Sequence, residues 1–224
     1  MSDDVANTLA HIARTIGERG SWEKGPGGWP EDIEAALVDA VFSARAVYRS
    51  KRGRGVHAEV VAWRDARSRT HFTLDALVAE IDDAGPAEWA RRFGNSQVSP
   101  GRPASAPGGA SKAATTRQAA RALTNLGISV DTQIDINNVD TVKTALRSVP
   151  GLGYATVNYF LMLLGLPGVK PDRMIHRFVM DATGHDFTNT GAERTISAAA
   201  RQLDVQPNEL DHAIWSYESQ RAQT

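Results

Sequence analysis

The sequence predicts an all-α protein. Apolar residues recur at three- and four-residue spacing in eight segments, which is the period of a helix with one buried face. A convincing alternating strand pattern is absent, because the one apolar stretch that hints at it, 128–130, is too short to form a stable strand. The eight predicted helical segments are 5–16, 33–47, 74–81, 116–126, 139–146, 154–164, 174–180 and 210–217.

Glycine and proline separate these segments. Pro30 is expected near the first turn of the second helix, where its missing N–H costs little. SKRGRG (50–55) separates two further helices. The stretch 94–111, rich in Gly, Pro and Ser, is either a divider between two lobes or a loop facing a ligand. The segment 210–217 is expected to pack Leu210, Ile214 and Tyr217 onto the rest of the fold.

The composition is that of an ordinary globular protein, and it excludes several kinds of site. Of the 224 residues, 42% are hydrophobic and 23% are charged, and there is no cysteine. Disulfides, thiolate zinc sites and cysteine-ligated iron-sulfur clusters are therefore excluded. The histidines lack the paired spacing of a zinc site, so no metal held by side chains is predicted. No apolar run has the roughly 20 residues that a membrane helix needs, and a cytoplasmic location is expected.

The net charge of −1 hides an uneven distribution of charge. Binding to phosphates depends on the local field rather than on the total charge. The segment 45–69 therefore predicts a phosphate-binding surface, although a solvated helical face explains the same pattern. Its basic residues are Arg45, Arg49, Lys51, Arg52, Arg54, Arg64, Arg67 and Arg69, opposed only by Glu59 and Asp65.

The sequence VPGLG, residues 149–153, predicts a tight turn between two helices. Pro150 presets a turn, whereas Gly151 and Gly153 permit unusual backbone angles and leave room for close approach. A helix that starts directly after Gly153 points its unsatisfied N–H groups and its positive dipole end outward, which suits a phosphate. An ordinary helix-turn-helix connection explains the turn equally well.

Asp172 follows Pro171 at the predicted start of another helix. The helix dipole favours the charged carboxylate at such a position. A purely helix-stabilising role is the commonest one for Asp there, whereas the functional interpretation aims the charge at a ligand.

The order of helix, VPGLG hairpin, apolar helix and DRMIHR, within residues 140–184, resembles the helix-hairpin-helix superfamily of DNA glycosylases. The Thr156 and Asn158-Tyr159-Phe160 run is similar to its alkyl-purine branch. Two upstream segments add weaker similarity, ALVDAVFSAR (36–45) and 111–126. The resemblance implies a two-lobed fold with a DNA-binding cleft, with lobes at 30–135 and at 1–29 plus 136–224, and the helix-hairpin-helix at 139–164.

The resemblance also implies the chemistry. Such enzymes flip a damaged or modified base out of double-stranded DNA and cleave its N-glycosidic bond. Asp172 is then the catalytic carboxylate that stabilises positive charge on the sugar. The hairpin contacts to DNA would come from Pro150, Gly151, Leu152, Gly153, Tyr154 and Thr156.

Further residues are assigned on the same basis. The position where strand-cutting members carry a lysine nucleophile holds Ala155, so a monofunctional enzyme acting as a monomer is expected. No cofactor is expected, beyond a monovalent cation at the hairpin backbone. A non-catalytic DNA-binding protein is the alternative. The candidate wedge and pocket residues are Arg45, Tyr48, Trp22, Trp29 and His176, and the candidate phosphate contacts are Arg49, Lys51, Arg52, Arg54 and Lys112.

Overall fold

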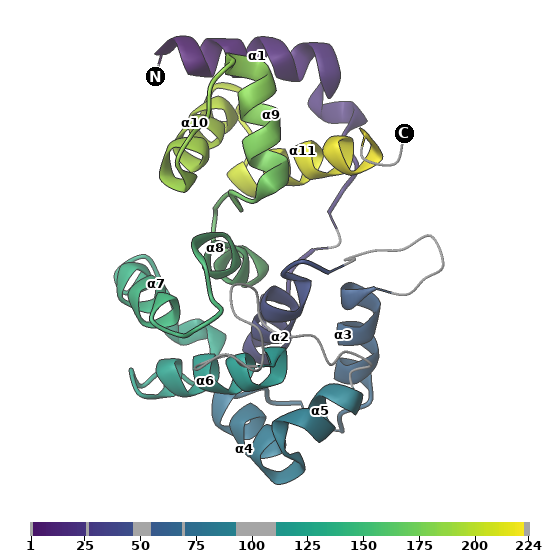
Figure 1. The fold of residues 1–224 in the computed structure, drawn as a ribbon, viewed down its shortest axis with the longest axis vertical. Coiled ribbons are helices and arrows are strands. Elements are labelled where there is room, and N and C mark those ends of the chain that lie inside the picture. Colours follow the sequence, from purple (N-terminus) through teal and green to yellow (C-terminus); the bar gives the residue numbers. More distant parts are fainter. Residues whose placement is uncertain (1, 26, 47–54, 69, 93–110, 222–224) are drawn as a thin grey trace. The chain divides into compact units, whose positions relative to one another are not determined.

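The computed structural model describes residues 2–25, 27–46, 55–68, 70–92 and 111–221. These ranges contain eleven α-helices and two short 3-10 helices and no strand (Figure 1). The prediction of an all-α protein is thus confirmed. None of the helices in these ranges combines the length and the apolar character needed to cross a membrane.

The chain divides into two compact units. Unit 1 comprises Met1–Gly27 and Leu166–Thr224, and unit 2 comprises Gly28–Gly165. The boundary differs from the one expected at residue 136, since the hairpin segment belongs to unit 2. The reason is packing: α7 (Val139–Arg147) lies against α6 (Lys112–Thr124), and α8 (Tyr154–Leu163) lies against α2 (Ile33–Ser43).

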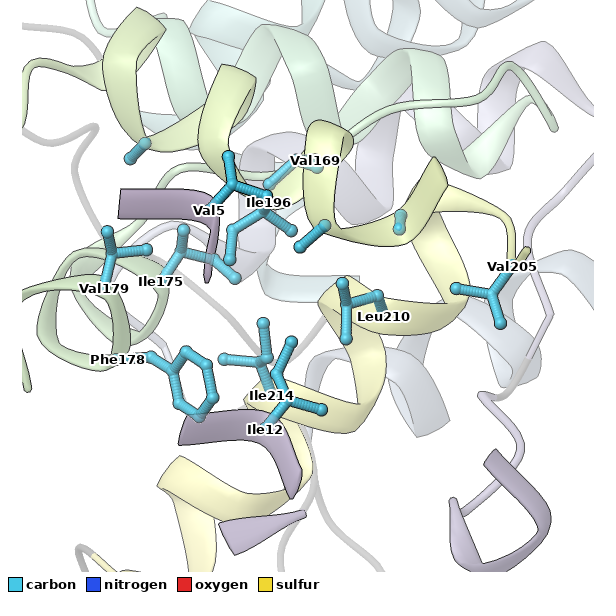
Figure 2. Packing of buried hydrophobic residues seen from close by; sticks show 13 residues of the cluster. Val5, Ile12, Val169, Ile175, Phe178, Val179, Ile196, Val205, Leu210 and Ile214 are labelled. Carbon is cyan, nitrogen blue, oxygen red and sulfur yellow. The ribbon is translucent and has the colours of Figure 1, made fainter. Parts of the chain in front are cut away.

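Unit 1 is a group of four helices around one apolar core. Helix α1 (Ser2–Thr15) packs against α9 (Arg173–Thr183) and α10 (Asn189–Gln202), and α11 (Pro207–Arg221) packs against the same two helices. Figure 2 shows side chains from all four helices meeting in this core. Leu210 and Ile214 are fully buried in it and Tyr217 packs on its edge, as expected from the sequence.

Unit 2 is built around α2, whose eleven residues are all buried. Helices α3 (Val56–Asp65), α4 (Leu74–Ala84), α6 and α8 each contact it. The sequence explains this position, because a helix that is apolar on nearly every side must be covered on every side. Helix α5 (Pro86–Arg92) packs on α4 and α6.

Two acids at the start of α2 neutralise part of the basic segment 45–69. Asp32 caps the helix by accepting from the backbone N–H of Ala35 at 2.9 Å, and it also accepts from Arg64 at 3.0 Å and Arg67 at 3.1 Å. Arg67 pairs with the buried Glu34 as well. The Arg67 side chain is only 8% exposed. Its charge is thus used inside unit 2, and the interpretation of this residue as part of a phosphate-binding surface is wrong.

Several element boundaries differ from the expected ones. The second helix ends at Ser43 rather than at residue 47, whereas Pro30 lies near its first turn as expected, two residues before the cap, Asp32. Three helices were not predicted, α3, α5 and α10. Their windows are rich in alanine and polar residues, so the apolar period is weak. For example, α10 buries three alanines beside Ile196.

Candidate active site and nucleic-acid interface

The segment 148–153 forms a tight turn between α7 and α8. The N–H of Leu152 donates to the carbonyl of Val149 at 3.1 Å, which closes the turn around Pro150 and Gly151. Gly151 has φ of 95°, a conformation that side-chain-bearing residues rarely adopt. Val149 and Leu152 are buried and anchor the turn from below. The predicted helix, turn and helix are therefore present.

The first turn of α8 has no side-chain cap. Gly153 occupies the N-cap position in extended conformation, is exposed, and has no atom within 4 Å of where a Cβ would lie. Tyr154 and Thr156 are half-buried just behind it, and the Arg147 guanidinium lies 5.6 Å from the Tyr154 ring centroid. Backbone N–H groups at such a helix start have no partner within the helix, and they favour an anion.

Helix α6 supports this turn from the same unit. The Thr115 hydroxyl donates to the carbonyl of Pro150 at 3.4 Å. Lys112, expected to contact phosphate, is instead 1% exposed, and its Nζ donates to the carbonyl of Phe42 at 2.6 Å. Burial lowers the pKa of Lys112 to about 8. The predicted phosphate contact is wrong, because the first residue of α6 faces the core below its cap, Ser111.

Asp172 is the N-cap of α9 in unit 1. Its Oδ1 accepts from the backbone N–H of Met174 at 2.8 Å and from that of Ile175 at 3.4 Å. The residue is half-buried, and Pro171 before it is buried. The helix therefore begins at Arg173, and the carboxylate is fixed over the positive end of the helix dipole.

A second carboxylate lies behind the loop that carries Asp172. Asp211 on α11 is 8% exposed, and its Oδ1 accepts from the backbone N–H of Lys170 at 2.8 Å. The carbonyl of Lys170 in turn accepts from the N–H of Asp172 at 2.6 Å. Burial raises the pKa of Asp211 to about 7, the Lys170 N–H opposes this rise, and the negative charge of Asp172 adds to it.

His176 lies one turn after Asp172, with its backbone N–H donating to the Asp172 carbonyl at 3.0 Å. Its Nε2 is 2.8 Å from Oδ1 of Asn189 in the first turn of α10. The imidazole is half-buried. It links the starts of α9 and α10, which is a packing role.

The two tryptophans expected near a base have different surroundings. Trp22 packs against the apolar core of unit 1, and its Nε1 donates to the Gly17 carbonyl at 3.2 Å, so it is a packing residue. Trp29 in unit 2 is half-buried, and its Nε1 donates to Asp39 at 2.9 Å. The His57 ring centroid lies 5.5 Å from that of Trp29.

Gly28 explains why Trp29 is fixed there. A Cβ on Gly28 would lie 2.2 Å from the carbonyl oxygen of Leu163, so only glycine fits against the end of α8. The N–H of Trp29 donates to that same carbonyl at 2.5 Å. The loop before α2 is thereby joined to the helix that follows the hairpin.

Arg45 is exposed and lies two residues after the end of α2, with φ of 54°. A non-glycine residue in this left-handed region is strained, and such strain is common where a side chain is directed at a ligand. The other expected contacts of this segment lie outside the described residues. They are Tyr48, Arg49, Lys51, Arg52 and Arg54.

Sequence reasoning missed Asp39, His57 and Asp211. Asp39 is fully buried, accepting from Trp29 and from the Ser43 hydroxyl at 2.8 Å, and the His57 Nδ1 lies 4.0 Å away. A signal was available for Asp39, which stands alone within the apolar run 35–42. No group of three or more His, Asp or Glu side chains suited to a metal ion occurs within the described ranges.

Of three comparisons with known proteins, one gives a match, and that match covers nearly the whole chain. Neither the curated proteins nor the solved structures give a match. A family model matches residues 6–219, which include both units, the hairpin and Asp172. The chain therefore belongs to the family described as "Domain of unknown function (DUF8548)".

Proposed function

We propose that this protein is a cytoplasmic, monofunctional DNA N-glycosylase that removes a damaged or modified base and leaves an abasic site. The observation that carries the proposal is Asp172. The residue is half-buried, and its carboxylate is held by two backbone N–H groups at a helix start, in the region where the sequence resembles helix-hairpin-helix glycosylases. An acid fixed in this way is suited to stabilising a cation.

Cleavage of an N-glycosidic bond develops positive charge on the sugar, and a fixed carboxylate stabilises that charge. Asp172 stays in place during the reaction because its Oδ1 is bonded to the Met174 and Ile175 amides. Its other oxygen is the one proposed to face the sugar or to orient the attacking water. The bond between C1′ of the sugar and the base nitrogen breaks, water adds its oxygen to C1′, and the proton that the water loses balances the charge of the departing base.

The hairpin supplies the proposed grip on the DNA backbone. Exposed Gly153 and the uncapped first turn of α8 leave backbone N–H groups for a phosphate. This contact orients the duplex and does not read sequence. Arg45 is the side chain proposed to fill the gap that the flipped nucleotide leaves in the duplex. Trp29 and His57 offer an aromatic surface on which the flipped base stacks.

The test is base release from duplex and single-stranded DNAs that carry damaged, alkylated, deaminated or hypermodified bases. Wild type is expected to release one class of base, and Asp172→Asn to release it about 100-fold or more slowly. Asn caps a helix about as well as Asp does, so the variant should keep its stability. Borohydride trapping on abasic DNA should give no covalent adduct.

Thr188→Ala is the matched control. Thr188 caps α10 by accepting from the Gly191 N–H at 3.1 Å, so this variant loses a helix cap in the same unit without loss of a carboxylate. It should lose about 1 kcal/mol of stability and keep its rate of base release. If wild type and Asp172→Asn bind DNA equally and neither releases any base, the protein is a DNA-binding protein without this activity.

A further inference from the structure

We propose that Asp211 is a positioning residue, which holds the loop from Val169 to Asp172 in the conformation that presents the Asp172 carboxylate. This role rests on the proposed function for its catalytic consequence. The link itself lies entirely within unit 1, between α11 and the residues just before α9.

The surroundings of Asp211 call for an explanation. Its neighbours on α11, Leu210, Ala213 and Ile214, are buried apolar residues of the unit 1 interior. A carboxylate placed among them loses hydration, which is unfavourable unless it makes a specific hydrogen bond. The bond that the structure gives it is to the backbone of Lys170 at 2.8 Å.

Three hydrogen bonds in sequence connect this buried acid with the helix start. Asp211 accepts from the Lys170 N–H, the Lys170 carbonyl accepts from the Asp172 N–H at 2.6 Å, and Asp172 accepts from the Met174 N–H at 2.8 Å. Pro171 has no N–H, so Lys170 and Asp172 provide the donors on either side of it. Removal of the first bond thus takes away a hydrogen bond that ties the backbone of Lys170 to α11.

The charges around Asp211 agree with this role. The loop contributes Lys170 and Asp172, and across the α9–α11 contact Arg177 is occupied by the buried Glu218. The raised pKa of Asp211, about 7, means that much of it is protonated near neutral pH. A protonated carboxyl group still accepts from the Lys170 N–H, and it does not place a second negative charge beside Asp172.

The experiment compares Asp211→Leu with Asp211→Asn. Leu shares the branching of Asp at Cγ and suits an apolar site, although it is larger, and it cannot accept a hydrogen bond, whereas Asn is close to Asp in volume and retains the acceptor oxygen. In the Leu variant, hydrogen exchange of the Lys170 amide should quicken about tenfold or more, and the amide NMR signals of Asp172 and Met174 should shift. Single-turnover base release should slow about tenfold with DNA affinity unchanged. The Asn variant should stay within about threefold of wild type in every readout.

Asp186→Ala is the control, since Asp186 is an exposed acid of the same unit. If the Leu variant leaves the Asp172 and Met174 signals in place, or if Asn loses as much rate as Leu, the positioning role is wrong. If wild type releases no base, the proposed function fails, and the NMR comparison alone still decides whether Asp211 holds Asp172. Should Asp211→Leu not fold, Asp211→Ala takes its place in the same comparison.

Discussion

The starts of α9 and α8 solve the same physical problem in opposite ways. At α9 a carboxylate of the chain itself, Asp172, accepts from the first free amides. At α8 the cap is Gly153, with no side chain and open space around it. The first helix start is complete without a ligand, and the second leaves donors that an external anion can fill. Under the proposed function, the first helix start would serve the sugar and the second would serve the phosphate.

Gly153→Asp tests this difference with the largest expected effect. The extended backbone at Gly153 accepts any residue, so an Asp there should cap α8 and raise the free energy of unfolding by about 0.3 kcal/mol. The added carboxylate would occupy the amides and repel phosphate, which should weaken DNA binding about 100-fold. Fluorescence anisotropy with labelled DNA and thermal unfolding measure the two effects.

Gly20→Asp provides the control for that substitution. Gly20 is exposed and also has open space where a Cβ would lie, but it is outside the hairpin. The Gly20→Asp variant adds the same charge to the protein as Gly153→Asp does. If both variants lose DNA affinity to a similar extent, net charge rather than the hairpin controls binding.

Asp211 on α11 and Lys112 on α6 should make the free energy of unfolding depend on pH in opposite directions. Because the pKa of Asp211 is raised, the folded chain retains a proton on this residue between about pH 4 and 7, whereas the unfolded chain does not. The free energy of unfolding therefore falls as the pH rises through that window. From pH 4.5 to pH 7.5, wild type should lose on the order of 2 kcal/mol of unfolding free energy relative to Asp211→Asn. Urea unfolding at pH 4.5 and at pH 7.5 measures this difference, and parallel curves for the two proteins would contradict it.

Lys112 should give the opposite slope. Its lowered pKa, about 8, means that the unfolded chain binds the extra proton between about pH 8 and 10.5. Wild type should therefore gain about 1–2 kcal/mol of stability relative to Lys112→Met as the pH rises from 7.5 to 10. Urea unfolding across this range measures the gain, and Lys143→Met in the same unit is the control, because Lys143 is only half-buried.

Arg45→Gly should have the smallest effect. Glycine removes the strain of the left-handed backbone, so unfolding free energy should stay level or rise by up to about 1 kcal/mol. Base release should fall about three- to tenfold if the side chain is a wedge. A matched change in the exposed Arg147→Gly variant would show that any lost surface cation has the same effect.

Much of the fold followed from local pattern. The apolar period identified eight helices, and the VPGLG and P-D signals located both helix starts, because turn and cap chemistry depends on neighbours in sequence. Lys112 and Arg67 were misassigned, since their burial depends on residues far along the chain, Phe42 and Glu34. Asp211 was missed for the same reason, because its partner is 41 residues away.

The division of the chain has a consequence for protein synthesis. Unit 2 is continuous, from Gly28 to Gly165, so all of its helices are translated before α9. Helix α1 is translated before unit 2, yet its partners α9 and α10 are translated after it. Its apolar residues Val5 and Ile12 therefore lack their packing partners on α9 and α10 while unit 2 is synthesised. The loop that carries Asp172 can therefore pack against α11 only after the whole of unit 2 has been translated.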